Sequence, residues 1–129
     1  MKTTITVLQW IVRLCFLALL VLGIAFWTGH GLSLIPLHTA VGTVLVLGLW
    51  ITSGLAAAAR APAGMVAAGF IWGIVVLAFG ATQMSILPGP SHWIIQVTHL
   101  LVGMAAVGLN ERLARTAQER ISNHAGQAA

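Results

Sequence analysis

The sequence is poor in the residues that soluble proteins place on their surfaces. Lysine, arginine, aspartate and glutamate make up only 6% of the 129 residues, whereas hydrophobic residues make up 59%. Because a soluble domain carries about 25% charged residues, this chain could not cover a water-exposed surface. The composition therefore predicts an integral membrane protein. The net charge of +4 then concerns membrane topology and is no sign of nucleic-acid binding.

Cysteine and acidic residues are also scarce. The single cysteine, Cys15, cannot close a disulfide within the chain, and no C-x-x-C or C-x-x-C-H motif occurs. These absences exclude dithiol redox chemistry, thiolate zinc sites and covalently attached c-type haem. There is no aspartate, and the only acidic residues are Glu111 and Glu119, which follow the last apolar stretch. The pattern therefore argues against a carboxylate-dependent hydrolase.

Four apolar stretches are long enough to cross a bilayer, which takes about 20 residues each. They cover residues 5–28, 34–58, 64–87 and 91–110. Turn-forming residues separate them, at Gly29 to Gly31, at Pro62 and at Pro88-Gly89-Pro90. We predict an all-α integral membrane fold, an up-down four-helix transmembrane bundle over residues 1–110, followed by a polar tail at 111–129.

The basic residues indicate how this bundle is oriented. All six fall on one side of the predicted spans: Lys2, Arg13, Arg60, Arg112, Arg115 and Arg120. The positive-inside rule then places both termini and the loop between the second and third spans in the cytoplasm. We accordingly expect a multi-pass protein of the inner, cytoplasmic membrane. The Arg13 side chain is expected to extend toward the cytoplasmic headgroups.

A short motif occurs twice in the outer halves of the spans. It reads His38-x-x-Val41-Gly42 in the second span and His99-x-x-Val102-Gly103 in the fourth. The repetition suggests two pseudo-repeated helical hairpins, with the two histidines on diagonal helices that face the bundle centre. A diagonal of about 11–14 Å between helix axes is too wide for one tetrahedral zinc but suits a porphyrin between two imidazoles. The glycines one turn later would leave room for such a macrocycle.

With these motifs the chain resembles the four-helix membrane-bound b-type cytochromes. The resemblance implies one haem b near the outer, periplasmic face, with His38 and His99 as axial iron ligands and with Gly42 and Gly103 beside it. It also implies electron transfer between a quinol or quinone and an outer-side acceptor, either a periplasmic redox protein or another membrane subunit. The protein would act as an electron carrier or a quinol-linked oxidoreductase, and a homodimer or a larger complex is compatible with this role. The cytoplasmic halves of the spans contain no histidine, so a second bis-histidine site is excluded there.

The ligand pair is open to alternatives. Counted from the start of each span, His38 lies nearer the outer face than His99, by roughly 6 Å of helix. His92 matches the depth of His38 better, and His30 could also enter the site. His30 and His92 are otherwise candidate proton acceptors at a quinol site, because imidazole titrates near neutral pH.

Two other classes of function also fit the sequence. In one, the four outer histidines form a copper or zinc site of a metal-handling membrane protein. In the other, the protein is a non-catalytic subunit or assembly factor whose histidines are buried polar contacts. Trp50 and Trp72 lie deep in their spans, where they could pack on a cofactor.

Overall fold

The computed structural model describes residues 1–127, and nearly all of this range is helical. Four long helices follow one another: α1 (Lys2–Trp27), α2 (Ile35–Ala58), α3 (Ala63–Thr82) and α4 (His92–Gln127). Two short 3-10 turns, η1 (Leu32–Leu34) and η2 (Gln83–Ser85), flank the loops before α2 and α4. Each long helix is long and apolar enough to cross a membrane. The predicted all-α fold with four apolar spans is confirmed.

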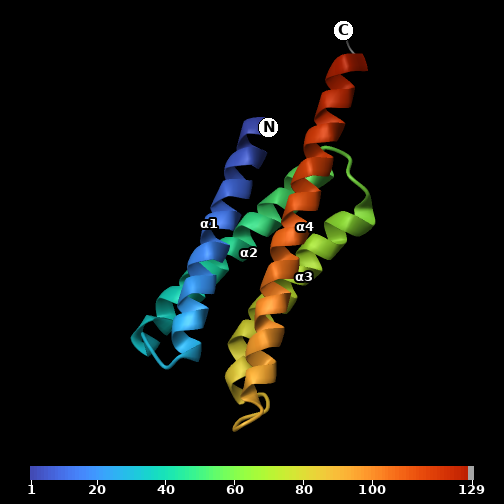
Figure 1. The fold of residues 1–129 in the computed structure, drawn as a ribbon. Helices are drawn as coiled ribbons and strands as arrows, with labels where there is room; N and C mark the ends of the chain where they lie inside the picture. Colours follow the sequence, from blue (N-terminus) through green and yellow to red (C-terminus); the bar gives the residue numbers. More distant parts are fainter. Residues whose placement is uncertain (128–129) are drawn as a thin grey trace.

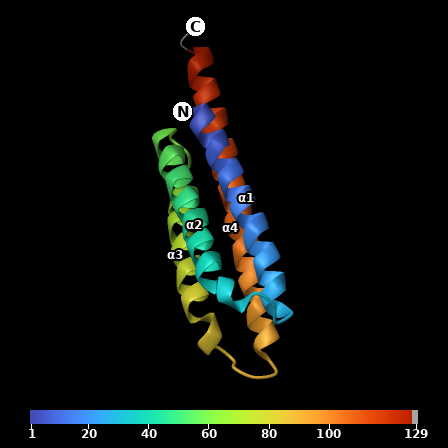
Figure 2. The same ribbon diagram turned by 90° about the vertical axis from the view of Figure 1, so that its left-hand side faces the viewer.

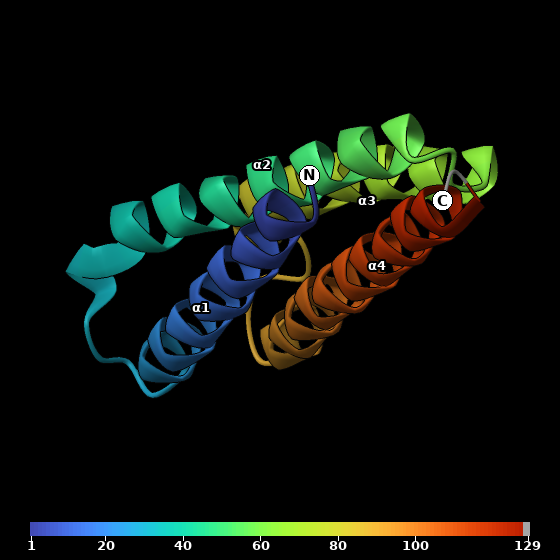
Figure 3. The ribbon, with the colours of Figure 1, turned by 90° about the horizontal axis from the view of Figure 1, so that it is seen from above.

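Successive helices run in opposite directions (Figure 1). Both chain termini and the α2–α3 turn therefore lie at one end, and η1 and η2 lie at the other. We call the half that contains the termini and the α2–α3 turn the terminal half. The half that contains η1 and η2 is called the cavity half, after the large cavity described below. The helices form two layers, with α1 beside α4 and α2 beside α3 (Figures 2 and 3). Helix α2 also contacts α4 directly, so these two helices meet across the layers.

The helix breaks coincide with the predicted turn residues. Gly29 and Gly31 adopt φ values of 79° and 67° after α1, and Gly89 adopts 99° before α4. These left-handed conformations cost little for glycine because it has no Cβ. Pro62 precedes the first residue of α3, where its missing N–H leaves no helical hydrogen bond unmade. The turns, and with them the order of the helices, are encoded locally.

The hydrophobic core lies in the terminal half. Its buried members come from the start of α1, the second half of α2 and the later part of α4, among them Ile5, Val12, Leu45, Leu49, Ala106, Leu113 and Ala117. Helix α4 runs without a break from the fourth span into the segment predicted as a tail. Because Leu113, Ala114 and Ala117 are fully buried, the first part of that segment belongs to the bundle core.

Three glycines allow close helix packing in and beside this core. A Cβ added at Gly48 would lie 2.7 Å from Val12 Cγ2, nearer than real Cβ atoms come. At Gly69 it would overlap Ser53 Oγ, and at Gly73 it would overlap the indole of Trp50. Small residues at helix contacts are typical of membrane bundles, since they let backbones approach.

A polar contact joins α1 to α4 in the same half. Arg13 donates through Nε and Nη2 to the two carboxylate oxygens of Glu111, both at 2.8 Å. Gln9 Nε2 donates to Glu111 Oε2 at 2.9 Å, and Gln118 Nε2 donates to Gln9 Oε1 at 3.3 Å. Arg13 was expected to extend toward lipid headgroups, and its contact with Glu111 was not predicted. A two-point ion pair holds its guanidinium on the neighbouring helix.

The two deep tryptophans also contact neighbouring helices. Trp50 Nε1 donates to the Phe70 carbonyl and Trp72 Nε1 donates to the Val102 carbonyl, each at 3.1 Å. These bonds link α2 to α3 and α3 to α4. Neither tryptophan lines the large cavity described below, so the suggestion that they pack on a ligand there is not supported.

Candidate functional site

The cavity half contains a large cavity between the four helices. Its volume is about 990 Å³, at the upper end of the about 300–1,000 Å³ typical of ligand pockets. The lining is mostly apolar and comes from all four helices and from η1 and η2. Five of the site residues predicted from the sequence line this cavity: His38, Gly42, His92, His99 and Gly103. The hydrophobic core of the terminal half closes its inner end at Leu45.

Two imidazoles meet at this cavity. The ring centroids of His38 on α2 and His99 on α4 lie 6.2 Å apart, with an angle of 39° between the ring planes. Both side chains are partly buried. The Nδ1 atom of each ring is buried and has no hydrogen-bond partner. Burial of an unpartnered polar atom costs about 1–3 kcal/mol, so the two neighbouring rings are candidates for binding a ligand in the cavity.

Each of the two imidazoles packs against a phenylalanine of the preceding helix. The Phe26 ring at the end of α1 lies 5.5 Å from the His38 ring, measured between centroids. The Phe79 ring on α3 stacks on His99 at 5.9 Å with an interplanar angle of 16°. Each histidine therefore has one phenylalanine neighbour, but only the Phe79–His99 pair is stacked, since the Phe26 and His38 rings are tilted by 56°.

The depth difference between the two histidines does not keep them apart. Counting residues from the span ends suggested an offset of roughly 6 Å between their levels. In the structure the helices cross so that the two rings are neighbours. The direct contact between α2 and α4 brings this about, and the count along each helix could not show it.

Two glycines outside the repeated motif also lie next to these rings. A Cβ added at Gly23 on α1 would lie 4.0 Å from His38 Cε1. At Gly80 on α3 it would lie 3.6 Å from His99 Cε1. Both distances are ordinary van der Waals contacts, so close helix packing does not require glycine here. Their lack of a side chain instead widens the space around each imidazole.

The two glycines of the repeated motif have the same character. A Cβ at Gly42 would meet only Leu19 at 4.0 Å, and a Cβ at Gly103 would meet only Phe16 at 3.8 Å. With Gly23 and Gly80, each of the four helices contributes one glycine to the cavity wall. Gly23 lies beside His38 and Gly80 lies beside His99. These contacts join neighbouring helices, so the sequence alone does not reveal them.

The two other outer histidines occupy different positions. His92 lines the cavity near its mouth, and its Nδ1 lies 3.2 Å from the Ile86 carbonyl. His30 is exposed on the α1–α2 loop, with Nδ1 3.1 Å from Thr28 Oγ1, and it is not among the lining residues. Gln83 and Gln96, which were not singled out as site residues, line the cavity together with His92. The polar residues of the wall thus come mainly from α2 and α4, with Gln83 from η2.

The site brings two histidines together rather than four. Within residues 1–127, no group of three or more His, Cys, Asp or Glu side chains could hold a metal ion together. The four-histidine copper or zinc site considered from the sequence is therefore not formed by this arrangement. What the geometry offers is a pair of neighbouring imidazoles in a mostly apolar cavity.

Comparisons with models of protein families, with curated proteins and with solved structures return no match to this chain.

Proposed function

We propose that the protein is a membrane-bound b-type cytochrome that holds one haem b between His38 and His99. The observation that carries the proposal is the spacing of the two rings. With a metal–nitrogen bond of about 2 Å and about 1 Å from the ring nitrogen to the ring centre on each side, two imidazoles that held one metal ion between them would have centroids up to about 6 Å apart. The observed separation is 6.2 Å. The two imidazoles would therefore be close enough to hold one iron between them.

The rest of the cavity also suits a large apolar macrocycle. The volume of about 990 Å³ and the mostly apolar wall match what a porphyrin requires. The four wall glycines leave space on both sides of the imidazole pair, and they have no packing reason to be glycine. Haem b would supply reversible one-electron transfer when bound. The protein's part is to fix the two imidazoles and to keep water from the iron.

Membrane topology follows from the distribution of charge. All six basic residues lie in the terminal half, and the histidine cavity lies in the other half. Under the positive-inside rule the termini are cytoplasmic and the cavity opens toward the periplasmic side of the inner membrane. The up-down bundle would then consist of two pseudo-repeated hairpins, α1–α2 and α3–α4, each with one histidine, a phenylalanine packed on it and two glycines in the cavity wall.

Electrons would enter and leave on the outer side. The hydrophobic core lies between the cavity and the terminal end, and a second pair of histidines does not occur in the terminal half. A quinol could approach the polar stretch of wall formed by Gln83, His92 and Gln96. His92 is the better placed proton acceptor, because it lines the cavity and its Nδ1 contact with the Ile86 carbonyl leaves Nε2 free. His30 lies outside the cavity wall and would act only at its entrance. The electron acceptor would be a periplasmic redox protein or another membrane subunit.

The test is the cofactor content of the protein purified from haem-replete cells. We expect about one non-covalent haem b per chain, with the sharp reduced bands of low-spin, six-coordinate iron. A colourless preparation with a negative pyridine haemochrome assay would contradict the proposal. Stoichiometric copper or zinc in elemental analysis would instead support the metal-handling alternative.

A further inference from the structure

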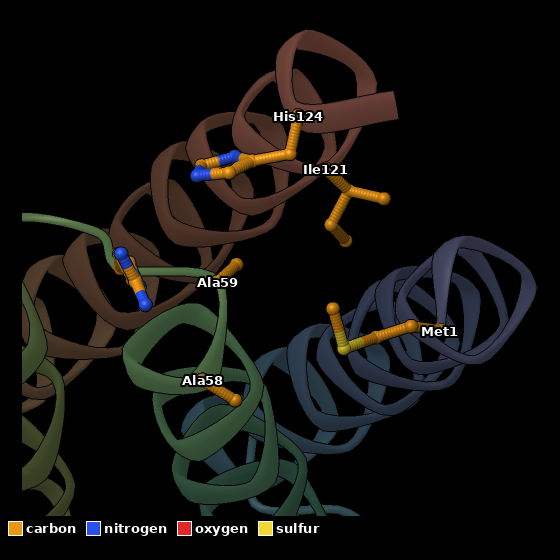
Figure 4. Close-up of a pocket in the computed structure, with 6 residues that line it drawn as sticks. Met1, Ala58, Ala59, Ile121 and His124 are labelled. Atoms are coloured by element: carbon orange, nitrogen blue, oxygen red, sulfur yellow. The ribbon is translucent and has the colours of Figure 1, made fainter. Parts of the chain in front are cut away.

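A second cavity lies at the opposite end of the molecule, in the terminal half. It has a volume of about 300 Å³. Its wall is formed by the last residues of α2, the α2–α3 turn, the last turns of α4 and the residue before α1: Met1, Ala58, Ala59, Arg60, Ile121 and His124. Figure 4 shows Ala58 and Ala59, Ile121 and His124, and Met1 on three sides of one hollow. This cavity has no part in the proposed haem site.

The wall combines an apolar surface with two groups that bind anions. Met1, Ala58, Ala59 and Ile121 supply the apolar part, and no carboxylate among the described residues 1–127 lines the cavity. His124 Nδ1 lies 2.7 Å from the Arg120 carbonyl. A carbonyl oxygen only accepts hydrogen bonds, so Nδ1 carries a proton, and in the imidazolium form Nε2 donates a second hydrogen bond to an anion. Such a wall suits an amphipathic anion.

Arg60 occupies a backbone position that favours glycine. Its φ is +59°, in the left-handed region, where it follows the end of α2. Glycine is the common residue at this place after a helix, because a Cβ is disfavoured there. The Arg60 side chain makes no hydrogen bond or ion pair to the described residues 1–127. The backbone of the turn does not need an arginine at this position. The Arg60 guanidinium is therefore available to bind a ligand in the cavity.

The position of the cavity along the helices points to the source of the anion. It lies at the ends of membrane-spanning helices, in the half that carries all the lysine and arginine of the chain. Basic pockets between transmembrane helices at the cytoplasmic face are suited to anionic lipid headgroups. A guanidinium binds phosphate oxygens at two points, while apolar walls accept the glycerol and the first acyl carbons.

We propose that this cavity binds the phosphate of an anionic phospholipid of the adjacent leaflet, with Arg60 and His124 as its ligands. The lipid would join α2 to the end of α4 at the point where α4 leaves the membrane. This proposal does not depend on haem binding. It requires only that the terminal end lies at a lipid surface.

The test measures lipid that stays bound to the purified full-length protein. Native mass spectrometry in mild detergent would follow a one-to-one adduct with phosphatidylglycerol, with phosphatidylcholine as the zwitterionic comparison. We expect the phosphatidylglycerol adduct to fall by about tenfold in Arg60→Gln and in His124→Ala, and by less than about twofold in Arg112→Gln. Arg112 is the matched control, because it is exposed and is absent from the wall.

Arg60→Gly separates binding from folding. Glycine adopts the left-handed conformation at lower cost, so this variant should melt at the same or a higher temperature while it loses the adduct. Three results would overturn the proposal. They are equal losses in Arg60→Gly and Arg112→Gln, equal retention of phosphatidylcholine, and displacement of the lipid by millimolar inorganic phosphate. The last result would identify a soluble phosphate site instead.

Discussion

The two halves of the molecule use the same residue type for opposite purposes. In the terminal half, Gly48 and Gly69 lie where a side chain would overlap a neighbouring helix. In the cavity half, Gly23 and Gly103 lie where a methyl group would fit without a clash. The first kind brings helices together and fills space, whereas the second leaves space unfilled. An empty cavity loses the dispersion contacts that packed side chains would make. Its position beside two imidazoles with unpartnered nitrogens therefore favours a ligand-binding site.

The largest expected effect concerns the imidazole pair. His38→Ala or His99→Ala should abolish low-spin haem, because the iron loses an axial nitrogen. His92→Ala and His30→Ala, the matched histidine controls, should keep a low-spin spectrum and change the midpoint potential or the rate of reduction by quinol. Absorption spectra of the four purified variants decide between them. Loss of haem in His92→Ala with its retention in His99→Ala would replace the proposed ligand pair.

The next effect concerns the side from which electrons arrive. In liposomes of known orientation, a membrane-impermeant oxidant should oxidise the haem at least about tenfold faster from the cavity end than from the terminal end. The physical reason is distance: at 1.5 Å per residue, the helix from His99 to Arg112 spans roughly 20 Å. Stopped-flow absorbance would give the two rates. Equal rates would contradict the one-sided scheme and would leave the ligand assignment intact.

The contrast between the two kinds of glycine predicts a difference in stability. Gly69→Ala should destabilise the protein by about 1–3 kcal/mol, because its Cβ would overlap Ser53 and approach Leu113 Cδ1 to 2.9 Å. Gly103→Ala should leave stability unchanged or raise it by up to about 1 kcal/mol, since alanine favours a helix over glycine. Thermal unfolding of the haem-free protein in detergent would compare them.

A larger side chain at the same position tests the purpose of the space. Gly103→Leu should retain helical circular dichroism while haem content falls, because the side chain would occupy the cavity. Normal haem content in this variant would mean that the glycine positions are not needed for the ligand.

The smallest expected effect concerns the ion pair between α1 and α4. Arg13→Gln or Glu111→Gln should lower the melting temperature slightly and leave the haem spectrum unchanged, because the pair lies in the terminal half and is partly exposed. The exchanged double variant Arg13→Glu/Glu111→Arg should recover part of the loss. A change of the haem spectrum in either single variant would show that the two halves are coupled.

Much of the fold was predictable because its signals are local. The four apolar stretches and the turns at Gly29, Gly31, Pro62 and Gly89 depend on the bilayer thickness and on backbone chemistry within a few residues. The end of the fourth span was less predictable. The charged residues after Asn110 suggested a tail. However, Leu113 and Ala117, which lie one helical turn apart, still pack into the core.

Part of the site was predictable from the repeated motif. His38, His99, Gly42 and Gly103 stand out because the same spacing occurs twice. Gly23, Gly80 and the two phenylalanines beside the imidazoles were not identified, since nothing in their own segments distinguishes them from packing residues. The ion pair of Arg13 with Glu111 was also missed, because its partners are far apart in the chain.

Composition and local patterns alone determined that the chain is an all-helical membrane protein with four spans and that its basic residues gather at one end. Only the tertiary structure decided which histidines meet, which glycines pack and which line a cavity, and that Arg13 pairs with Glu111. The physical reason is that hydropathy and turn chemistry are properties of short segments. The level at which two helices cross depends instead on the direct contact of α2 with α4, which no single segment encodes.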